Sequence, residues 1–365
     1  MAIYITVAIF MAILGKSLAY NVEQDRMYAD RKQSIKSVCL MILLVLVLAY
    51  ALRGTTGTDA GGYRRIFKSI YAYGTSLSER IADRRDDLFA VVEYFGSTIF
   101  KGSWFWGCVV YALFIYVPVL YVVVKESEDV QFSLLYYVLS LSAFSGYNGV
   151  KQALSMSFAF LGYCCFLSKR KYFGYAVCMI MAYMFHAAAL IFVPFHLLSR
   201  LKLRSKLTFL AIAGLLVGVV AFDSLTSFLA DATTESSLNE YFTGSFTGAS
   251  WLRVAVALIP IILYYTNPVN KEYPDEELDH RMILAIVTAI LCLYATKNKY
   301  YIRVSSYCSI MELITYPQII NRWKNSASSL RTIIIVMYIA YFLIFLLRGD
   351  SNLYPYIPIW QSSTW

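Results

Sequence analysis

The sequence predicts an all-α polytopic membrane protein, on two observations. Of its 365 residues, 59% are hydrophobic and only 15% are charged, a composition outside the range of soluble globular chains. Apolar runs of about 20 residues recur along the chain, and a helix needs this length to cross a bilayer. We therefore expect about 11–12 membrane helical segments. They are expected to form one integral membrane domain over residues 1–365.

Cysteine usage and net charge narrow the chemistry. All seven cysteines lie inside apolar runs, with no CxxC pair and no cluster with histidine, so they are expected to behave as small hydrophobic residues. We expect no metal and no cofactor. The net charge of +9 does not indicate nucleic acid, because in a membrane chain the location of lysine and arginine matters more than their total.

Positive charge sets the expected orientation of the spans. The first apolar run, residues 1–20, is followed by the basic residues of segment 26–36, which indicates an uncleaved anchor with its N-terminus outside. The second span, residues 36–52, then leads outward. Residues 53–101 are therefore expected to form an extracytoplasmic loop.

The later spans alternate in direction. They are expected at residues 102–124, 131–147, 152–167, 206–222, 251–265, 282–295, 304–320 and 332–347. This order leaves a second extracytoplasmic loop at residues 223–250.

The apolar run at residues 172–198 has basic clusters at both ends. A single crossing would export one cluster and invert every later loop, against the positive-inside bias. We therefore predict a helical hairpin with limbs about 20 Å long and an apex near Phe185 and His186. An ionisable group at membrane depth is a functional candidate by default, so His186 is a candidate catalytic residue; a hydrogen-bonded structural histidine is the alternative. His196 is expected at the membrane interface.

The loop at residues 53–101 is expected to carry two surface helices, near residues 63–72 and 87–100. The second has an apolar stripe at helical spacing, as in an amphipathic helix on the membrane interface. The stripe consists of Leu88, Val91, Val92, Phe95 and Ile99. Glu93 falls opposite this stripe, where it is either solvated or a candidate catalytic base.

The stretch RGTTGTDAGGYRRIF at residues 53–67 opens this loop. Its glycines permit tight turns and a close approach to a ligand, and Asp59 lies among them. Asp59 is a second candidate base, while an N-cap for the following helix is an equally good interpretation.

Ten lysines and arginines are expected on the extracytoplasmic side, where topology does not require positive charge. Each alone fits a side chain that reaches lipid headgroups. Together they indicate an anionic ligand, and the planar fork of arginine suits the oxygens of a lipid-linked diphosphate. The main candidates are Arg53, Arg64, Lys151, Arg303 and Arg348.

Five pieces of the sequence, taken in order, resemble the EpsG-like family of Wzy-type polysaccharide polymerases of O-antigen and exopolysaccharide. They are Arg53 with GTD at 57–59 and Tyr63; Glu93; KQALSMSFAF at 151–160; FHAAALIF at 185–192; and YYIRVSSY at 300–307. The chain departs from the family at Lys151, where arginine usually precedes glutamine, so the bidentate fork is lost. The resemblance implies substrate-binding roles for Tyr63, Gln152 and Tyr300, and a catalytic role for Arg303.

The resemblance also implies a multi-pass enzyme of the bacterial inner membrane, with a fold similar to type C glycosyltransferases and an active site facing the periplasm or exterior. Its substrates would be oligosaccharide repeat units linked to undecaprenyl diphosphate. The growing glycan would move to the non-reducing end of a new lipid-linked unit. A Wzx-type flippase and a chain-length regulator are the implied partners. Cations would stabilise the departing diphosphate without a metal, and Asp59, Glu93 or His186 would orient or deprotonate the acceptor.

Two other functions fit parts of this pattern. A glycosyltransferase or glycan ligase with a lipid donor would share the outward cations, and the length of its product would distinguish it. A polysaccharide or lipid transporter is expected to show paired ionisable groups at midplane depth and related sequence halves. The sequence shows neither feature.

Overall fold

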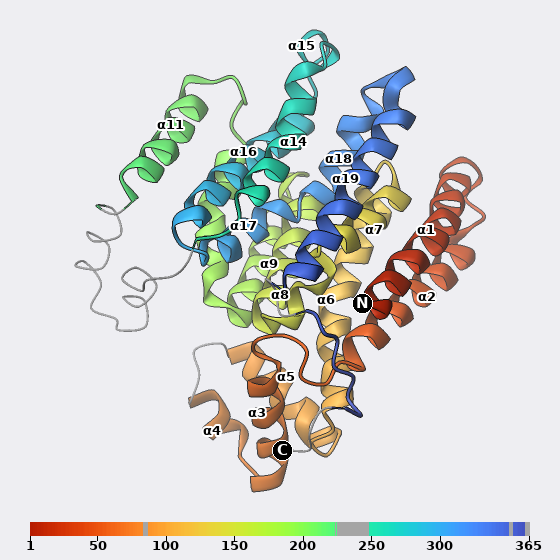
Figure 1. Cartoon of the computed structure of the whole chain (residues 1–365), viewed down its shortest axis with the longest axis vertical. Helices are drawn as coiled ribbons and strands as arrows, with labels where there is room; N and C mark the ends of the chain where they lie inside the picture. Colours follow the sequence, from red (N-terminus) through yellow and green to blue (C-terminus); the bar gives the residue numbers. More distant parts are fainter. Residues whose placement is uncertain (83–86, 223, 225–247, 350–352, 362–365) are drawn as a thin grey trace. The chain divides into compact units, whose positions relative to one another are not determined.

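The computed structural model describes residues 1–82, 87–222, 224, 248–349 and 353–361, and these residues are mainly helical (Figure 1). Six helical segments of the described chain are long and apolar enough to cross a membrane: α1 (Ala2–Tyr28), α2 (Lys32–Ala51), α6 (Trp104–Glu126), Val150–Leu167, α16 (Glu276–Lys297) and Lys324–Arg348. Shorter apolar helices accompany them. The prediction of an all-α polytopic membrane protein is confirmed.

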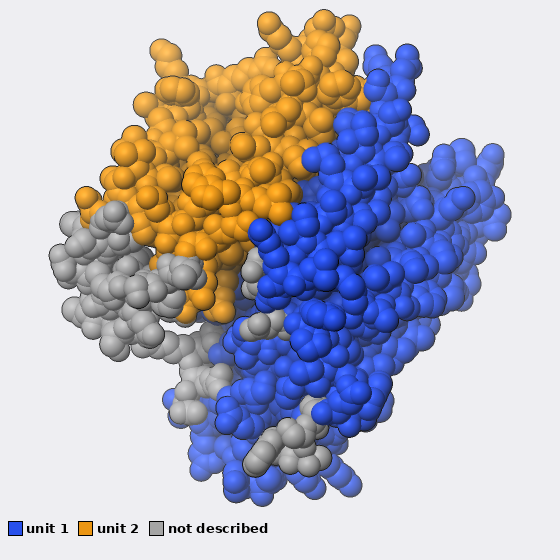
Figure 2. All heavy atoms as spheres, viewed as in Figure 1, with its two compact units in different colours: residues 1–189, 324–365 blue, residues 190–323 orange. Residues whose placement is uncertain are grey.

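The chain forms two compact units (Figure 2). Unit 1 contains residues 1–189 and 324–365, and unit 2 contains residues 190–323. The sequence predicts one membrane domain, and the first boundary falls inside the apolar run 172–198, where composition gives no sign of it.

Helix α6 is central to unit 1. It packs against both α2 and α8 (Val150–Gly162), while α1 packs against α2 and α7 (Val130–Leu139). The buried positions of α6 include Cys108, Tyr111, Ala112, Ile115 and Val119, which recur at helical spacing. Its exposed positions include Leu113, Phe114, Val117 and Tyr121, which suit contact with lipid because acyl chains are as apolar as these side chains.

The loop at residues 53–101 contains three helices. Helices α3 (Ala60–Tyr73) and α5 (Asp87–Ile99) confirm the two that the sequence predicts, and α4 (Leu77–Ala82) is an additional short helix. Helix α5 contacts α3, α4, α6 and α9 (Tyr172–Phe185). The loop is therefore a packed part of unit 1.

Two spans that the sequence predicts as continuous are interrupted. In the segment 131–147, α7 ends at Leu139, Leu141 has a φ of 67°, and the 3₁₀ helix η1 (Ser142–Tyr147) follows. In the segment 304–320, α17 (Tyr301–Ser309) gives way to α18 (Glu312–Asn321). Polar residues accompany both breaks, at Ser140 and Ser142 in the first and at Ser309 and Glu312 in the second, but each segment is still apolar on average.

The apolar run 172–198 is interrupted where the sequence predicts the apex of a hairpin. Helix α9 ends at Phe185, and His186 has extended backbone with φ −160° and ψ 114°. A 3₁₀ helix, η3 (Ala187–Ile191), and α10 (Phe192–Ser199) follow.

Helix α16 is central to unit 2. Helices α10, α11 (Lys206–Val220), α14 (Trp251–Thr266), α17 and α18 all contact it. The predicted second loop, residues 223–250, lies largely outside the described residues. His196 in α10 is fully buried within the protein, and its position at the membrane interface stays a prediction.

Asp129 and its neighbour Gln131 connect three helices of unit 1. Its Oδ1 accepts a capping bond from Phe132 N (2.9 Å) and its Oδ2 pairs with Arg331 Nε (2.8 Å) on α19 (Ala327–Arg348). Arg331 also donates to Gln131 Oε1 (2.8 Å), and Gln131 Nε2 donates to Ala12 O (3.0 Å) of α1. The ion pair therefore stabilises the packing of α7 against α19, and Gln131 connects α7 to α1.

Asp129→Ala is expected to lower the free energy of unfolding by about 1–3 kcal/mol, from the combined loss of a helix cap and a partly buried ion pair. Thermal unfolding of the purified protein in detergent measures this change. Asp30→Ala is the control, because Asp30 pairs with Arg31 at an exposed position. Equal unfolding temperatures for the two variants would contradict the assignment.

Candidate functional site

The segment after α2 is paired with the C-terminal part of the chain. Gly54 N donates to Ile357 O (2.7 Å), Ile357 N donates to Thr56 Oγ1 (2.7 Å), and Ile359 N donates to Leu52 O (2.8 Å). Arg53 and Pro358 form an isolated antiparallel bridge. We call residues 353–359 the C-terminal strap, and it fixes the path of residues 52–56.

The next residues of this loop are fixed against the YNGVK segment, residues 147–151. Thr58 N donates to Asn148 Oδ1 (3.0 Å). Gly57 has a φ of +104°, and a Cβ at this position would lie 2.0 Å from Tyr147 O. Only glycine fits this approach. Two sequence pieces separated by about 90 residues thus form one structure.

Gly57→Ala is expected to destabilise unit 1 by about 2 kcal/mol or more, because the new Cβ meets backbone and φ is strained. Gly62→Ala in α3 is the matched control, since a Cβ there has nothing within 4 Å. The control is expected to retain or raise stability, by up to about 1 kcal/mol, through higher helix propensity. Unfolding temperatures in detergent test both variants. Equal values for Gly57→Ala and Gly62→Ala would show that the loop around Gly57 shifts to make room for the new Cβ.

Arg53 is fully buried within this structure. Its guanidinium lies over the rings of Tyr50 (4.0 Å) and Tyr147 (4.7 Å), Nη1 donates to Gly146 O (3.2 Å), and Nη2 donates to Tyr50 Oη (2.9 Å). Burial lowers the pKa of Arg53, but Tyr50, Cys108 and Tyr147 raise it, and the net shift is upward. The sequence predicts an outward cation that contacts substrate; the structure instead encloses the fork of Arg53, which supports the loop.

Arg64 is also buried, with 7% of its surface exposed, and its environment differs from that of Arg53. Its Nε has no acceptor, and its guanidinium forms no hydrogen bond or ion pair with another described residue. Arg53 and Arg64 both lie close enough to Cys108 on α6 to act on its thiol electrostatically. A buried cation without a counter-charge is unfavourable, so this position is suited to an anionic ligand.

Tyr63 and Lys151 meet at Phe89. The ring of Tyr63 lies 5.6 Å from the Phe89 ring, edge to face, and Lys151 Nζ lies 5.2 Å from the centroid of the same ring. Residues of α3, α5 and α8 are thereby brought together. Gln152, next to Lys151 in the first turn of α8, has its Nε2 3.7 Å from Met156 Sδ.

Asp59 occupies the N-cap position of α3, but its carboxylate makes no capping hydrogen bond. The side chain is partly exposed and forms no ion pair with any described residue. The N-cap interpretation is therefore not realised, and Asp59 is an accessible carboxylate near the start of the helix that carries Tyr63 and Arg64.

Glu93 is fully buried and forms an ion pair with Arg80 of α4, in which Arg80 Nε donates to Oε2 at 3.1 Å. The prediction of a solvated face opposite the apolar stripe is wrong. Phe89, Ala90, Glu93 and Ser97 face the protein, while Phe95 and Ile99 are exposed. A carboxylate held by an arginine is a weak base, so this geometry favours a structural role for Glu93.

The remaining candidates lie elsewhere. His186 is partly exposed at the end of α9, and Arg348 is exposed in the last turn of α19. In unit 2, Arg303 is exposed on α17 with its guanidinium 5.4 Å from the ring centroid of Tyr300. The structure thus brings together Arg53, Asp59, Tyr63, Arg64, Lys151 and Gln152 in unit 1.

Several supporting residues were missed by sequence reasoning. Asn148, Arg80 and the C-terminal strap each hold one part of the site. Asn148 lies in the YNGVK turn, and a polar residue between two spans is a signal that could have identified it. No local signal identifies Arg80 as the partner of Glu93.

The model of the EpsG family matches residues 36–358. This range covers unit 1 from α2 to the C-terminal strap and all of unit 2. No curated protein and no solved structure matches the chain.

Proposed function

The chain belongs to the EpsG family of polysaccharide polymerases, and on this premise we propose that unit 1 binds the diphosphate of a lipid-linked glycan at Arg64. The reaction class is glycosyl transfer between oligosaccharide repeat units carried on undecaprenyl diphosphate. The growing glycan moves from its lipid carrier to a hydroxyl at the non-reducing end of a new lipid-linked unit. Polymer length increases by one repeat unit at each turnover.

The buried and unpaired guanidinium of Arg64 carries this proposal. An arginine that makes no hydrogen bond to the described protein retains its planar donor fork for a ligand, and phosphate oxygens match that fork. Arg53 adds positive potential to the site, while its own Nη1 and Nη2 donate to Gly146 O and Tyr50 Oη. Lys151 adds a further charge beside Tyr63 and Phe89.

The aromatic residue beside these cations suits a sugar. Tyr63 is partly exposed, and its ring rests edge to face on Phe89, which stacks on Tyr111 at 5.6 Å. Phe89 and Tyr111 are fully buried, so they support Tyr63 and do not contact the ligand themselves. The apolar face of a pyranose packs against an aromatic ring such as that of Tyr63, and Gln152 can hydrogen-bond to hydroxyl groups. The first sugar attached to the diphosphate is therefore proposed to lie near Tyr63.

Asp59 is the residue that we propose as general base. It is accessible, it is free of ion pairs with the described residues, and the backbone around it is fixed at Gly57 and Thr58. The carboxylate accepts the proton of the acceptor hydroxyl as that oxygen attacks the anomeric carbon and the bond to the diphosphate breaks. The cations stabilise the negative charge that develops on the departing diphosphate, without a metal.

Arg303, Tyr300, Arg348 and His186 are proposed as further contacts to substrate. Arg303 and Arg348 are exposed cations at helix ends, and His186 lies at a helix break. The enzyme is proposed to reside in the inner membrane with this site facing the periplasm. A flippase that delivers repeat units and a chain-length regulator are its proposed partners.

Binding of undecaprenyl diphosphate to purified variants tests the assignment of Arg64. The ligand is expected to raise the unfolding temperature of the wild-type protein, because it binds only the native state. Arg64→Gln is expected to weaken binding by about tenfold or more, since a charge-assisted bidentate contact is lost. Arg65→Gln is the control, because Arg65 is the next residue along the chain and its side chain is exposed. Equal affinity of both variants would exclude Arg64 as the phosphate ligand.

A further inference from the structure

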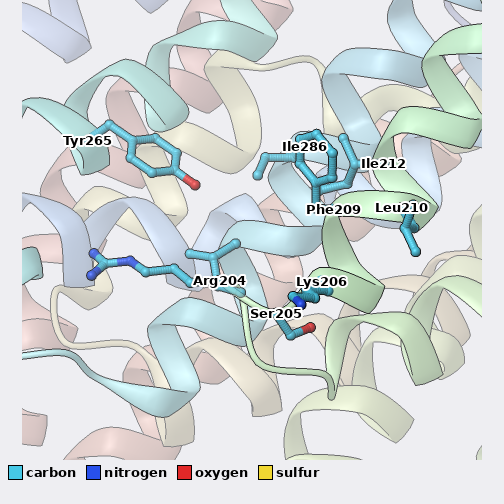
Figure 3. A pocket seen from close by; sticks show the side chains of 9 residues that line it. Arg204, Ser205, Lys206, Phe209, Leu210, Ile212, Tyr265 and Ile286 are labelled. Carbon is cyan, nitrogen blue, oxygen red and sulfur yellow. The ribbon is translucent and has the colours of Figure 1, made fainter.

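Unit 2 contains a cavity of about 660 Å³ that has no role in the proposed polymerisation (Figure 3). It lies between the start of α11 and residues of α14 and α16. Its size is within the range of small-molecule sites, about 300–1,000 Å³. Its lining includes Arg204, Lys206, Tyr265, Phe209, Ile212 and Ile286.

The polar part of this lining is cationic. Arg204 and Lys206 are exposed, and neither forms an ion pair with any residue in the described part of the chain. Asp279, the acidic group near Tyr264, instead accepts a hydrogen bond from the Tyr264 hydroxyl. The two cations therefore lack an ion-pair partner among the described residues, and Asp279 is an acidic group close to Tyr265.

The Tyr265 hydroxyl lies at the same end of the cavity as the Arg204 side chain (Figure 3). It offers a hydrogen-bond donor on the same side as Arg204, and Lys206 lies beside Ser205 further along the lining. Ser205 is not counted among the ligand-binding groups, because its Oγ already accepts the capping bond from Thr208 N (3.1 Å). The first turn of α11 adds the positive end of a helix dipole.

The rest of the lining is apolar and continues onto the surface of α11. Phe209, Ile212 and Ile286 lie together at the end of the cavity away from the Arg204 guanidinium (Figure 3). Phe209 is 70% exposed and Leu210 is 64% exposed, so apolar surface leads directly from the cavity to the outside of α11. A water-soluble anion would leave this surface uncovered, whereas a membrane lipid would cover it.

We propose that this cavity binds an anionic glycerophospholipid of the bilayer. Its single phosphodiester is held by Arg204, Lys206 and the Tyr265 hydroxyl. One acyl chain lies against Phe209, Ile212 and Ile286. Two cations match one phosphodiester, and the contiguous apolar wall matches an acyl chain.

Native mass spectrometry of the full chain tests this proposal. The protein is purified in detergent and exposed to equal amounts of phosphatidylglycerol and phosphatidylcholine. We expect preferential retention of phosphatidylglycerol by the wild-type protein, and a loss of that preference of about tenfold in Arg204→Gln/Lys206→Gln, because both charged contacts are removed. Lys202→Gln/Lys271→Gln is the matched control, because it removes two exposed cations of unit 2 that do not line the cavity.

A second variant tests the apolar part of the cavity while the charge of the protein stays the same. Leu210→Trp narrows the apolar side of the cavity and leaves both cations in place. It is expected to reduce retention of phosphatidylglycerol, and the unfolding temperature measured without lipid is expected to stay unchanged. Three results would overturn the proposal: equal loss in the control pair, no preference for the anionic lipid in the wild type, or displacement of the phospholipid by equimolar undecaprenyl phosphate. The last result would assign the cavity to the lipid carrier instead.

Discussion

Arg64→Ala is expected to lower the rate of polymerisation by about 10²–10³-fold, the range found when one preorganised donor to developing charge is removed. The reason is the position of its guanidinium, which is buried, close to Cys108 and unpaired among the described residues. Purified protein supplied with lipid-linked repeat units, and a gel that resolves polymer length, measure this change. Arg65→Ala provides the matched control on the exposed side of the same helix.

Substitution by lysine refines this test. Arg64→Lys keeps the charge and loses the planar fork, so its activity is expected to fall between those of the wild type and Arg64→Ala. Full activity in Arg64→Ala would show that the diphosphate does not bind at Arg64. Loss of activity together with a lowered unfolding temperature would instead indicate a structural role for Arg64.

Asp59→Asn is expected to lower polymerisation by about 10²–10⁴-fold, the usual contribution of a general base. Binding of undecaprenyl diphosphate is expected to be retained, because the cations that hold the diphosphate are unchanged. The unfolding temperature should not fall, since the carboxylate makes no capping bond to α3. Asp30→Asn, at an exposed residue on the first connection between helices, serves as the control.

The opposite result would reassign the base. Normal polymer length and rate in Asp59→Asn would show that another group deprotonates the acceptor. His186→Gln is then the next variant, because His186 is partly exposed at the break between α9 and η3. Glu93→Gln is expected to lower stability first, because it leaves Arg80 buried without its partner.

Much of the fold could be predicted from the sequence, because local composition determines where membrane helices form. Hydropathy located α1, α2, α6, α16 and α19, and the charge pattern located the interruption at Phe185. The breaks between α7 and η1, and between α17 and α18, could not be predicted. Neither has a glycine or proline at the break itself: Leu141 takes the positive φ, and Ile310 and Met311 separate the second pair.

The candidate site could be predicted in part. The sequence identified Arg53, Asp59, Tyr63 and Arg64 from their clustering after a span, and Lys151 from its place at the start of another. It could not show that Arg53 would be enclosed by Tyr50 and Tyr147, because that contact joins residues far apart in the chain.

Glu93 illustrates a difference between membrane and soluble proteins. In a soluble protein, the apolar stripe of a helix such as α5 faces the core and the opposite face is solvated. Here Phe95 and Ile99 are exposed, and Glu93 is buried beside Arg80. A helix at the membrane can direct its apolar face to lipid and its ionisable groups inward, where they find partners. The stripe alone does not decide which face is buried.

The C-terminal strap has a consequence for biogenesis. Thr56 and Ile357 are 301 positions apart, yet the hydrogen bonds between them shape the loop that precedes Asp59. A ribosome delivers α2 and α3 to the membrane long before it reaches residue 357. In a nascent chain this loop therefore lacks its final pairing until nearly all of the protein has been synthesised.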